Sequence, residues 1–247
     1  MIPIPGYAYS NLSISRDQTQ FSMGATCIPL DSAWGNNLQI KRQRLPTSVM
    51  PVPESGIPAA QGFARASGIP YRDGLVKNRY IGRTFIAPSQ EMRALWVKMK
   101  LNPIRHNIEN QRLVVVDDSI VRGTTTRAIV EMLRSAGAAE VHLRISSPPY
   151  RWPCFYGMDT GTQGELLAAN LNMQEIRDYL GVDSIAYLEL DRLIDATEAP
   201  GAGFCTACLD GQYPVEIPEG LTRNVLEERR DDRGTTFVST SQMKLGQ

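Results

Sequence analysis

Apolar residues after position 49 fall into short blocks that follow either the pattern of a buried strand or that of a helix. The clearest block is Leu113–Val116, an uninterrupted apolar run of the length expected for a buried strand. Polar residues follow it, and a helical pattern then places apolar residues from Ile129 to Leu133 on one face before Gly137 ends it. This stretch predicts a strand, a polar turn and a helix in direct succession.

The region around this stretch alternates strands and helices. Short strands are expected before the Pro51–Gly56 turn, over 141–146 and over 185–188, and helices over 58–65, from Ser89 to about Lys100, over 164–170 and over 173–180. Such alternation predicts an α/β domain with a parallel sheet flanked by helices, which binds ligands at the carboxyl ends of its strands.

The first 49 residues differ from the rest of the chain. They show neither helical periodicity nor strand alternation, and they scatter Pro, Gly, Ser and Asn throughout. We expect residues 1–49 to be a poorly structured segment and residues 50–200 to form the α/β domain. Residues 201–225 then form a segment whose C-x-x-C lies in a loop that Ala199-Pro200-Gly201 opens, and 226–247, rich in charge and Ser/Thr, form a disordered tail.

The polar turn after the central strand carries the candidate chemistry. Asp117 and Asp118 end the apolar run, and Ser119, Arg122 and Gly123 lead into three threonines at the start of the helix. A helix N-terminus favours an anion, so a phosphate can bind there without a lysine. The carboxylates could hold sugar hydroxyls or Mg²⁺. Together these groups describe a site for a phosphoribosyl group, although solvated turn residues before a capped helix are the alternative.

Composition narrows the function classes. The 247 residues allow one large domain or two small ones, and the formal net charge of zero implies neither nucleic acid nor an acidic membrane surface as a partner. There is no Walker loop, no apolar run of membrane-spanning length and no secretory leader pattern, so we expect a cytoplasmic protein. The four cysteines are Cys27, Cys154, Cys205 and Cys208, and the last two form a C-x-x-C typical of redox or metal chemistry.

Several segments in order carry a family resemblance. The chain contains V-P-E-S-G-I-P-A-A, G-L-V-K-N-R-Y-I-G-R-T-F-I, V-V-V-D-D-S-I-V-R-G-T-T-T-R, I-S-S-P-P, P-C-F-Y-G-M-D-T and C-T-A-C. The third of these resembles the phosphoribosyl pyrophosphate (PRPP) motif of type I phosphoribosyltransferases, and the whole order, from Met50 to Pro218, resembles the amidophosphoribosyltransferase family. The resemblance implies a type I phosphoribosyltransferase fold. It also implies formation of 5-phosphoribosylamine and pyrophosphate from Mg²⁺-bound PRPP and ammonia, in the first step of de novo purine biosynthesis.

The resemblance also implies roles for individual residues, none of them a covalent nucleophile. Glu54, Ser55 and Gly56 match the family's pyrophosphate loop; Lys77, Arg79, Tyr80 and Arg83 match the segment that closes over PRPP; Asp117 and Asp118 match its ribose and magnesium carboxylates; Ser119, Arg122, Gly123, Thr124, Thr125 and Thr126 match its 5-phosphate loop. Ser55 matches a further magnesium position. Without the family resemblance, P-E-S-G is a plain strand-ending turn and the basic segment is a solvated loop.

Three cysteines extend the resemblance. Cys154, Cys205 and Cys208 match three of the four ligands of the 4Fe–4S cluster found in one branch of the family. The fourth ligand is missing, because Cys27 lies in a context that does not resemble the family. An inert thiol at Cys154 with a zinc-bound or empty C-x-x-C is the alternative. The family further implies purine nucleotides as inhibitors and a homo-oligomer for its full-length members.

The chain departs from the family at its N-terminus. It begins Met1-Ile2-Pro3, so we expect no glutaminase domain and no glutamine hydrolysis by the family route. When residues 1–49 are back-translated and read one base earlier, their degenerate codons can encode Y-F-A-R-P-D-S, a segment that resembles the family. We therefore interpret Met1 to about Ser48 as an out-of-frame translation, the alternative being an unrelated genuine extension.

Three alternatives to this enzymatic function stay open at this point. The domain could bind PRPP or nucleotides as a regulator without catalysis, or it could be a base-salvage phosphoribosyltransferase, although no base-recognition segment is readable. A product too unstable to act is the third, because a scrambled leading segment would leave apolar surface exposed.

Overall fold

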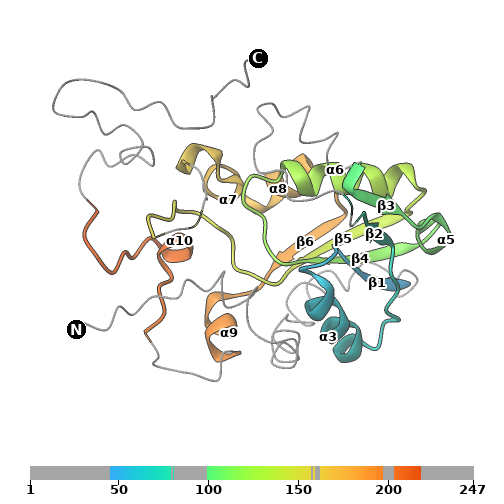
Figure 1. The fold of residues 1–247 in the computed structure, drawn as a ribbon, viewed down its shortest axis with the longest axis horizontal. Coiled ribbons are helices and arrows are strands. Elements are labelled where there is room, and N and C mark those ends of the chain that lie inside the picture. The colour runs from blue at the N-terminus through green and yellow to red at the C-terminus, as the bar shows by residue number, and fades with distance from the viewer. Residues whose placement is uncertain are drawn as a thin grey trace, which may run out of the picture.

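A parallel sheet of four strands forms the centre of the computed structural model, which describes residues 45–78, 80, 99–156, 158, 162–196 and 203–217. The strands are β1 (Ser48–Pro51), β4 (Arg112–Asp117), β5 (Glu140–Ile145) and β6 (Ser184–Tyr187), in the spatial order β1-β4-β5-β6 (Figure 1). Each neighbouring pair runs parallel. The carboxyl ends of all four strands therefore lie at one edge of the sheet.

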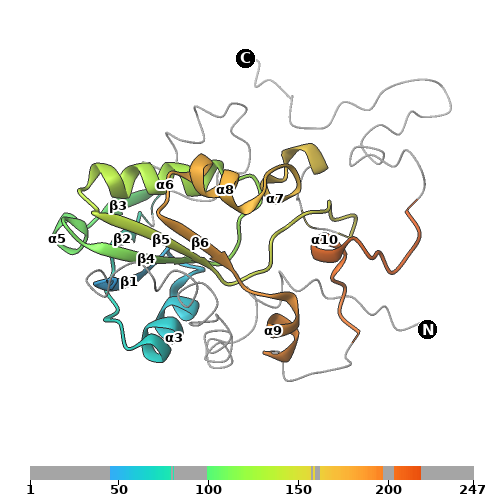
Figure 2. The ribbon, with the colours of Figure 1, turned by 180° about the vertical axis from the view of Figure 1, so that it is seen from behind.

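Helices cover both faces of this sheet. Helix α3 (Ile57–Ser67) lies on one side, and α6 (Thr124–Ser135) and α8 (Met173–Leu180) lie on the other (Figures 1 and 2). Strand β4 is buried on both faces because its side chains alternate between the two layers. Leu113 and Val115 pack with the α6 layer, whereas Val114 and Val116 pack against α3, and all four are 0% exposed.

Smaller elements surround the sheet. Strands β2 (Leu75–Lys77) and β3 (Leu101–Pro103) form an antiparallel pair. The remaining elements are α5 (Arg105–Ile108), the 3₁₀ helix η2 (Gln163–Glu165), α7 (Leu167–Asn170), α9 (Leu190–Asp195) and α10 (Ala207–Asp210). Within the described ranges, no helix combines the length and apolar character that crossing a bilayer requires.

The structure confirms the predicted α/β architecture and corrects several details. The helix predicted over 164–170 is divided into η2 and α7 at Leu166, whose backbone is extended, and the N–H of Leu167 donates to the Val121 carbonyl at 2.9 Å. The C-x-x-C, predicted in a loop, lies partly on α10, which contains Cys208. β1 begins at Ser48, two residues before the predicted start of the domain.

Other predictions lie wholly or partly outside the described residues. These are the segment 1–44, the tail from 218 onward and most of the helix predicted from Ser89. The short elements β3, α5 and α9 were not predicted, because three to six residues are too few to show a periodic pattern.

Helix α8 begins with a capping box that stabilises its first turn. Asn172 Oδ1 accepts hydrogen bonds from the N–H groups of Gln174 and Glu175 at 3.0 Å each, and Glu175 Oε2 accepts from the Asn172 N–H at 2.8 Å. We expect Asn172→Ala to lower the free energy of unfolding by about 1 kcal/mol, measured by urea denaturation. Asn172→Asp keeps the acceptor and serves as the control; an equal loss in both variants would contradict the capping role.

Candidate functional site

The carboxyl ends of β1 and β4 place two turns side by side. Pro51 pairs with Val116 in the sheet register, and the Val52 N–H continues the ladder by donating to the Val116 carbonyl at 2.8 Å. The turn after β1 and the turn after β4 enclose a cavity of about 350 Å³, which we call the β1–β4 cavity. Its lining residues are Val52, Ser55, Asp117, Asp118, Ser119, Ile120, Val121, Arg122, Gly123, Thr124, Thr125 and Thr126.

The two carboxylates at the end of β4 form the acidic part of this cavity. Asp117 is 7% exposed, and its Oδ1 accepts from the Asp118 N–H at 2.9 Å, while Asp118 Oδ1 accepts from the Ser119 N–H at 2.8 Å. Burial, together with the neighbouring Asp118 carboxylate, raises the pKa of Asp117 well above its ordinary value. A divalent cation would offset both effects, so this pair is suited to binding one when both groups are ionised.

Helix α6 begins at the opposite end of the turn without a side-chain cap. Its N-cap residue is Gly123, and among the described residues no side chain caps the first turn with a hydrogen bond. The first N–H groups of the helix therefore remain available to an anion, which the helix dipole also favours. Gly123 has φ 76°, a left-handed conformation that favours glycine, and a Cβ there would also push the end of the Leu167 side chain, whose Cδ2 would lie 2.8 Å away.

The turn after β1 approaches β4 closely. A Cβ on Gly56 would overlap the Val116 carbonyl oxygen and lie 2.9 Å from the Val52 carbonyl oxygen, so only glycine fits there. The same turn is linked to β2, because Lys77 Nζ lies 2.7 Å from Glu54 Oε2. The side chains of Lys77 and Glu54 are 28% and 55% exposed, so this ion pair is solvated and a ligand can compete with it.

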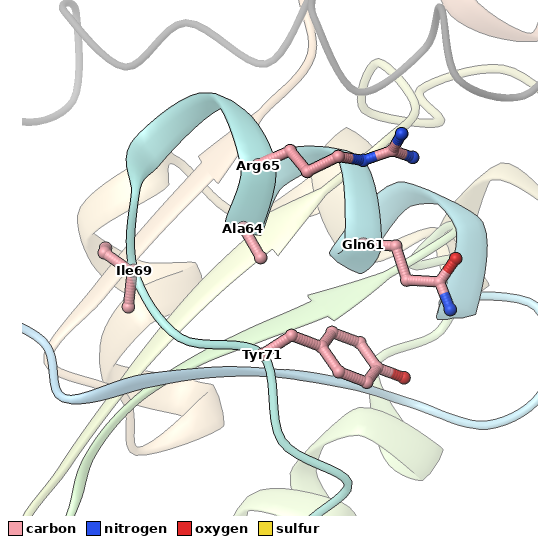
Figure 3. A pocket seen from close by; sticks show the side chains of 5 residues that line it. All are labelled: Gln61, Ala64, Arg65, Ile69 and Tyr71. Atoms are coloured by element: carbon pink, nitrogen blue, oxygen red, sulfur yellow. The ribbon is translucent and has the colours of Figure 1, made fainter.

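A second, larger cavity lies beside α3 and differs in its chemistry. It measures about 580 Å³, and its described lining residues come from α3 and the segment that follows it: Gln61, Ala64, Arg65, Ile69 and Tyr71 (Figure 3). One of these five is cationic and none is a carboxylate. The combination of carboxylates and helix N-terminus is thus found at the β1–β4 cavity.

Comparison with known proteins identifies the family. Residues 33–146 match the phosphoribosyl transferase domain family. The chain is 55% identical over 178 residues to the amidophosphoribosyltransferase of Synechococcus elongatus, covering 72% of this chain and 36% of that protein. It is 53% identical over 174 residues to that of Methanothermobacter thermautotrophicus, covering 70% and 37%. The chain belongs to the amidophosphoribosyltransferase family.

A solved structure of the family shares the fold. The glutamine PRPP amidotransferase from B. subtilis, complexed with ADP and GMP, superposes with a TM-score of 0.72 at 40% sequence identity. The match covers 90% of this chain and 50% of the B. subtilis chain. The present chain thus spans about a third of the length of the curated amidophosphoribosyltransferases that it matches.

Most of the site residues predicted from the sequence meet at the β1–β4 cavity. Ser55 and every predicted residue of the 117–126 turn line it. Glu54 and Lys77 do not line the cavity but are paired with each other, and Gly56 packs behind it against β4. Tyr80 is fully exposed and does not line it, and Arg79 and Arg83 lie outside the described residues.

Sequence reasoning missed two kinds of residue at the site of this amidophosphoribosyltransferase homologue. Val52, Ile120 and Val121 line the cavity, and their position between predicted residues was the available signal. Glu165 binds Arg122, with Oε2 at 2.9 Å from Nη2 and 3.2 Å from Nε. No local pattern links two residues that are 43 positions apart, so the sequence gives no sign of this pair.

The three cysteines that match family cluster ligands are brought into one neighbourhood. Burial, and then the proximity of Cys154 and Cys205, raises the pKa of the Cys208 thiol to about 12. These three are not joined to one another by disulfides. Tyr213 stacks edge-on with Phe155 and Tyr156 beside them, at 5.4 and 6.3 Å between ring centroids.

The cysteine neighbourhood does not have the geometry of a formed metal site. Within the described ranges, no group of three or more His, Cys, Asp or Glu side chains is arranged to hold a metal ion. Cys27 lies outside those ranges. Cys thiolates are nevertheless the usual ligands of iron–sulfur clusters.

Proposed function

We propose that this chain carries out the phosphoribosyltransferase reaction of its family, forming 5-phosphoribosylamine and pyrophosphate from PRPP and ammonia. The observation that carries this proposal is the β1–β4 cavity, which two adjacent carboxylates and an uncapped helix N-terminus share. PRPP has a matching sequence of groups, namely a 5-phosphate, a ribose diol and a pyrophosphate. The family relationship supports the same assignment.

The two turns hold opposite ends of the ligand in this proposal. The 5-phosphate binds at the start of α6, where N–H groups and the hydroxyls of Thr124–Thr126 can donate to it. Asp117 and Asp118 hold the ribose diol and, with Ser55, would hold Mg²⁺, which supplies charge neutralisation for the pyrophosphate. The turn after β1 and Lys77 then bind the pyrophosphate, once Lys77 has left Glu54.

The reaction needs positioning and charge stabilisation rather than a covalent nucleophile. The lone pair of ammonia attacks the anomeric carbon from the face opposite the pyrophosphate, and the C–O bond breaks with its electrons leaving on pyrophosphate. The new ammonium group then releases one proton to solvent. The chain contributes by fixing the ribose between its two phosphate-binding turns, which converts an encounter of two solutes into an aligned displacement.

Partners and compartment follow from this assignment. We propose ammonia as the nitrogen donor, because its lone pair can displace pyrophosphate directly at the anomeric carbon. Purine nucleotides also carry a 5-phosphate, and the B. subtilis relative was solved with ADP and GMP, so we propose them as inhibitors. We further propose a homo-oligomer and a cytoplasmic location, where thiols stay reduced.

Pyrophosphate release tests the function directly. The purified chain is incubated with Mg²⁺, PRPP and an ammonium salt, and pyrophosphate is measured against a sample without ammonium. Ammonium-dependent release is the expected result. Tight PRPP binding by calorimetry without release would instead indicate a non-catalytic regulator, and release that requires a purine base would indicate a salvage enzyme.

We also propose that Cys154, Cys205 and Cys208 bind a 4Fe–4S cluster. Anaerobic reconstitution with iron and sulfide is expected to give cluster absorption in the visible range and bound iron, and Cys208→Ala is expected to lose most of both because it removes one of three thiolates. Cys27→Ala is the control and should retain the cluster. Loss of the cluster in Cys27→Ala would make Cys27 the fourth ligand, and zinc binding without iron would contradict the proposal.

A further inference from the structure

The turn after β4, to which we assign the 5-phosphate, packs against the segment around η2. Three consecutive residues of the turn make contacts with this segment. The Val121 carbonyl accepts from the Leu167 N–H at 2.9 Å, and Gly123 packs so closely under Leu167 that a Cβ would lie 2.8 Å from its Cδ2. Between these two contacts, Arg122 binds Glu165.

The Arg122–Glu165 pair is specific in its geometry. Two guanidinium N–H groups, on Nε and Nη2, donate to the same carboxylate oxygen at 3.2 and 2.9 Å. This arrangement fixes both the position and the orientation of a planar cation, unlike a single contact from a flexible ammonium. Arg122 also lines the β1–β4 cavity, and within the described residues its Nη1 makes no hydrogen bond.

Exposure indicates that the pair does not act mainly through fold stability. The side chains of Arg122 and Glu165 are 30% and 50% exposed, and ion pairs this solvated contribute little to folding. The backbone contact through Leu167 remains when the Glu165 carboxylate is removed. We therefore expect that removing the Glu165 carboxylate lets the Arg122 side chain adopt several conformations while the domain stays folded.

We propose that Glu165 is a positioning residue for phosphate binding, which holds the Arg122 guanidinium at the rim of the cavity so that Nη1 meets the 5-phosphate of the ligand. This inference rests on the proposed function, because it assigns the 5-phosphate to the turn after β4. It adds a residue from a distant segment that does not itself line the cavity. Ordering Arg122 before the ligand arrives reduces the entropy lost on binding.

Calorimetry on the full chain with two simple probes tests this role. The probes are ribose 5-phosphate, which carries the 5-phosphate, and Mg²⁺-pyrophosphate, which does not. We expect Glu165→Ala to weaken ribose 5-phosphate binding by about 5–20-fold, in the lower range of typical coupling between a ligand and a remote group. Pyrophosphate binding should stay within about twofold, since its turn follows β1. Glu165→Gln keeps one acceptor oxygen and should show a smaller loss.

A double-mutant cycle separates positioning from a general structural effect. In an Arg122→Ala background, Glu165→Ala should have no further effect on ribose 5-phosphate binding, because the guanidinium that Glu165 positions is gone. The matched control is Glu131→Ala, which removes the carboxylate that pairs with Arg127 at 3.1 Å on the exposed surface of α6. It should leave both affinities unchanged, and the unfolding temperatures of all variants should stay close to that of the wild type.

The outcomes distinguish this inference from the function on which it rests. If the wild type binds ribose 5-phosphate and Glu165→Ala binds it equally well, only the role of Glu165 is overturned. An equal loss of both probes, or an undiminished loss in the Arg122→Ala background, would also overturn it. A wild-type chain that binds neither ribose 5-phosphate nor PRPP would overturn the proposed function, and the role of Glu165 with it.

Discussion

Gly56→Ala is expected to destabilise the fold severely, although it adds only one methyl group. The new Cβ would overlap the Val116 carbonyl oxygen and lie 2.9 Å from that of Val52, and both atoms are backbone in the sheet or its extension. Neither can move without breaking the β1–β4 register. We expect the free energy of unfolding to fall by about 3 kcal/mol or more, and the unfolding temperature by roughly 6–12 °C.

Gly164→Ala provides the matched control for this prediction. Gly164 lies in η2, and a Cβ there would meet no atom within 4 Å. The control should unfold within about 2 °C of the wild type, because an unstrained surface substitution changes stability by roughly 0.5 kcal/mol at most. Similar unfolding curves for Gly56→Ala and Gly164→Ala would show that the turn after β1 can shift away from β4.

Asp118→Asn is expected to cause the largest loss of activity with an intact fold. The amide keeps the shape of the side chain and an oxygen that can accept from the Ser119 N–H, but it removes the negative charge that would bind Mg²⁺. In the ammonia-dependent pyrophosphate assay, we expect kcat/KM to fall by about a hundredfold to a thousandfold. Because this charge would act on the bound ligand, higher Mg²⁺ concentrations should restore only part of the rate.

An exposed acidic residue that does not line the cavity controls for the loss of charge. Asp191 is exposed on α9, and Asp191→Asn removes the same net charge. It should leave kcat/KM unchanged within about a factor of two, as expected for a surface substitution away from the site. Wild-type activity in Asp118→Asn would mean that the carboxylate pair does not bind the metal-bound substrate, and the assignment of the cavity would fail.

The sequence was sufficient to predict the sheet and its central turn for a physical reason. Strand β4 is apolar from Leu113 to Val116 because these residues are buried on both faces of the sheet, and α6 shows a clear apolar stripe. Signals of this kind are local, since they depend on which faces of one element are covered. The acidic pair and the threonines follow β4 directly, so the main chain carries them to the edge where ligands bind.

Two features that the sequence could not predict depend on contacts between distant segments. Leu166 interrupts a helical pattern because Leu167 donates its N–H to Val121, in the turn after β4. The pairing of Glu165 with Arg122 also joins two segments that are distant in the chain. Cys208 was expected in a loop, but it lies on a short helix whose four residues are too few for a periodic signal. Tertiary packing decides the first two cases, in which local preference is secondary.

The pairing of β1 with β4 has a consequence for synthesis on the ribosome. Thr47 and Arg112 meet where the two strands begin, yet they are 65 residues apart in the chain. At roughly 5–20 residues per second, β1 leaves the ribosome on the order of 3–13 s before its partner is complete. During that wait, Val49 and Met50 have no β4 to cover them, so the nascent chain exposes an apolar segment that a chaperone can bind. Compaction of this domain should therefore begin only once β4 has emerged.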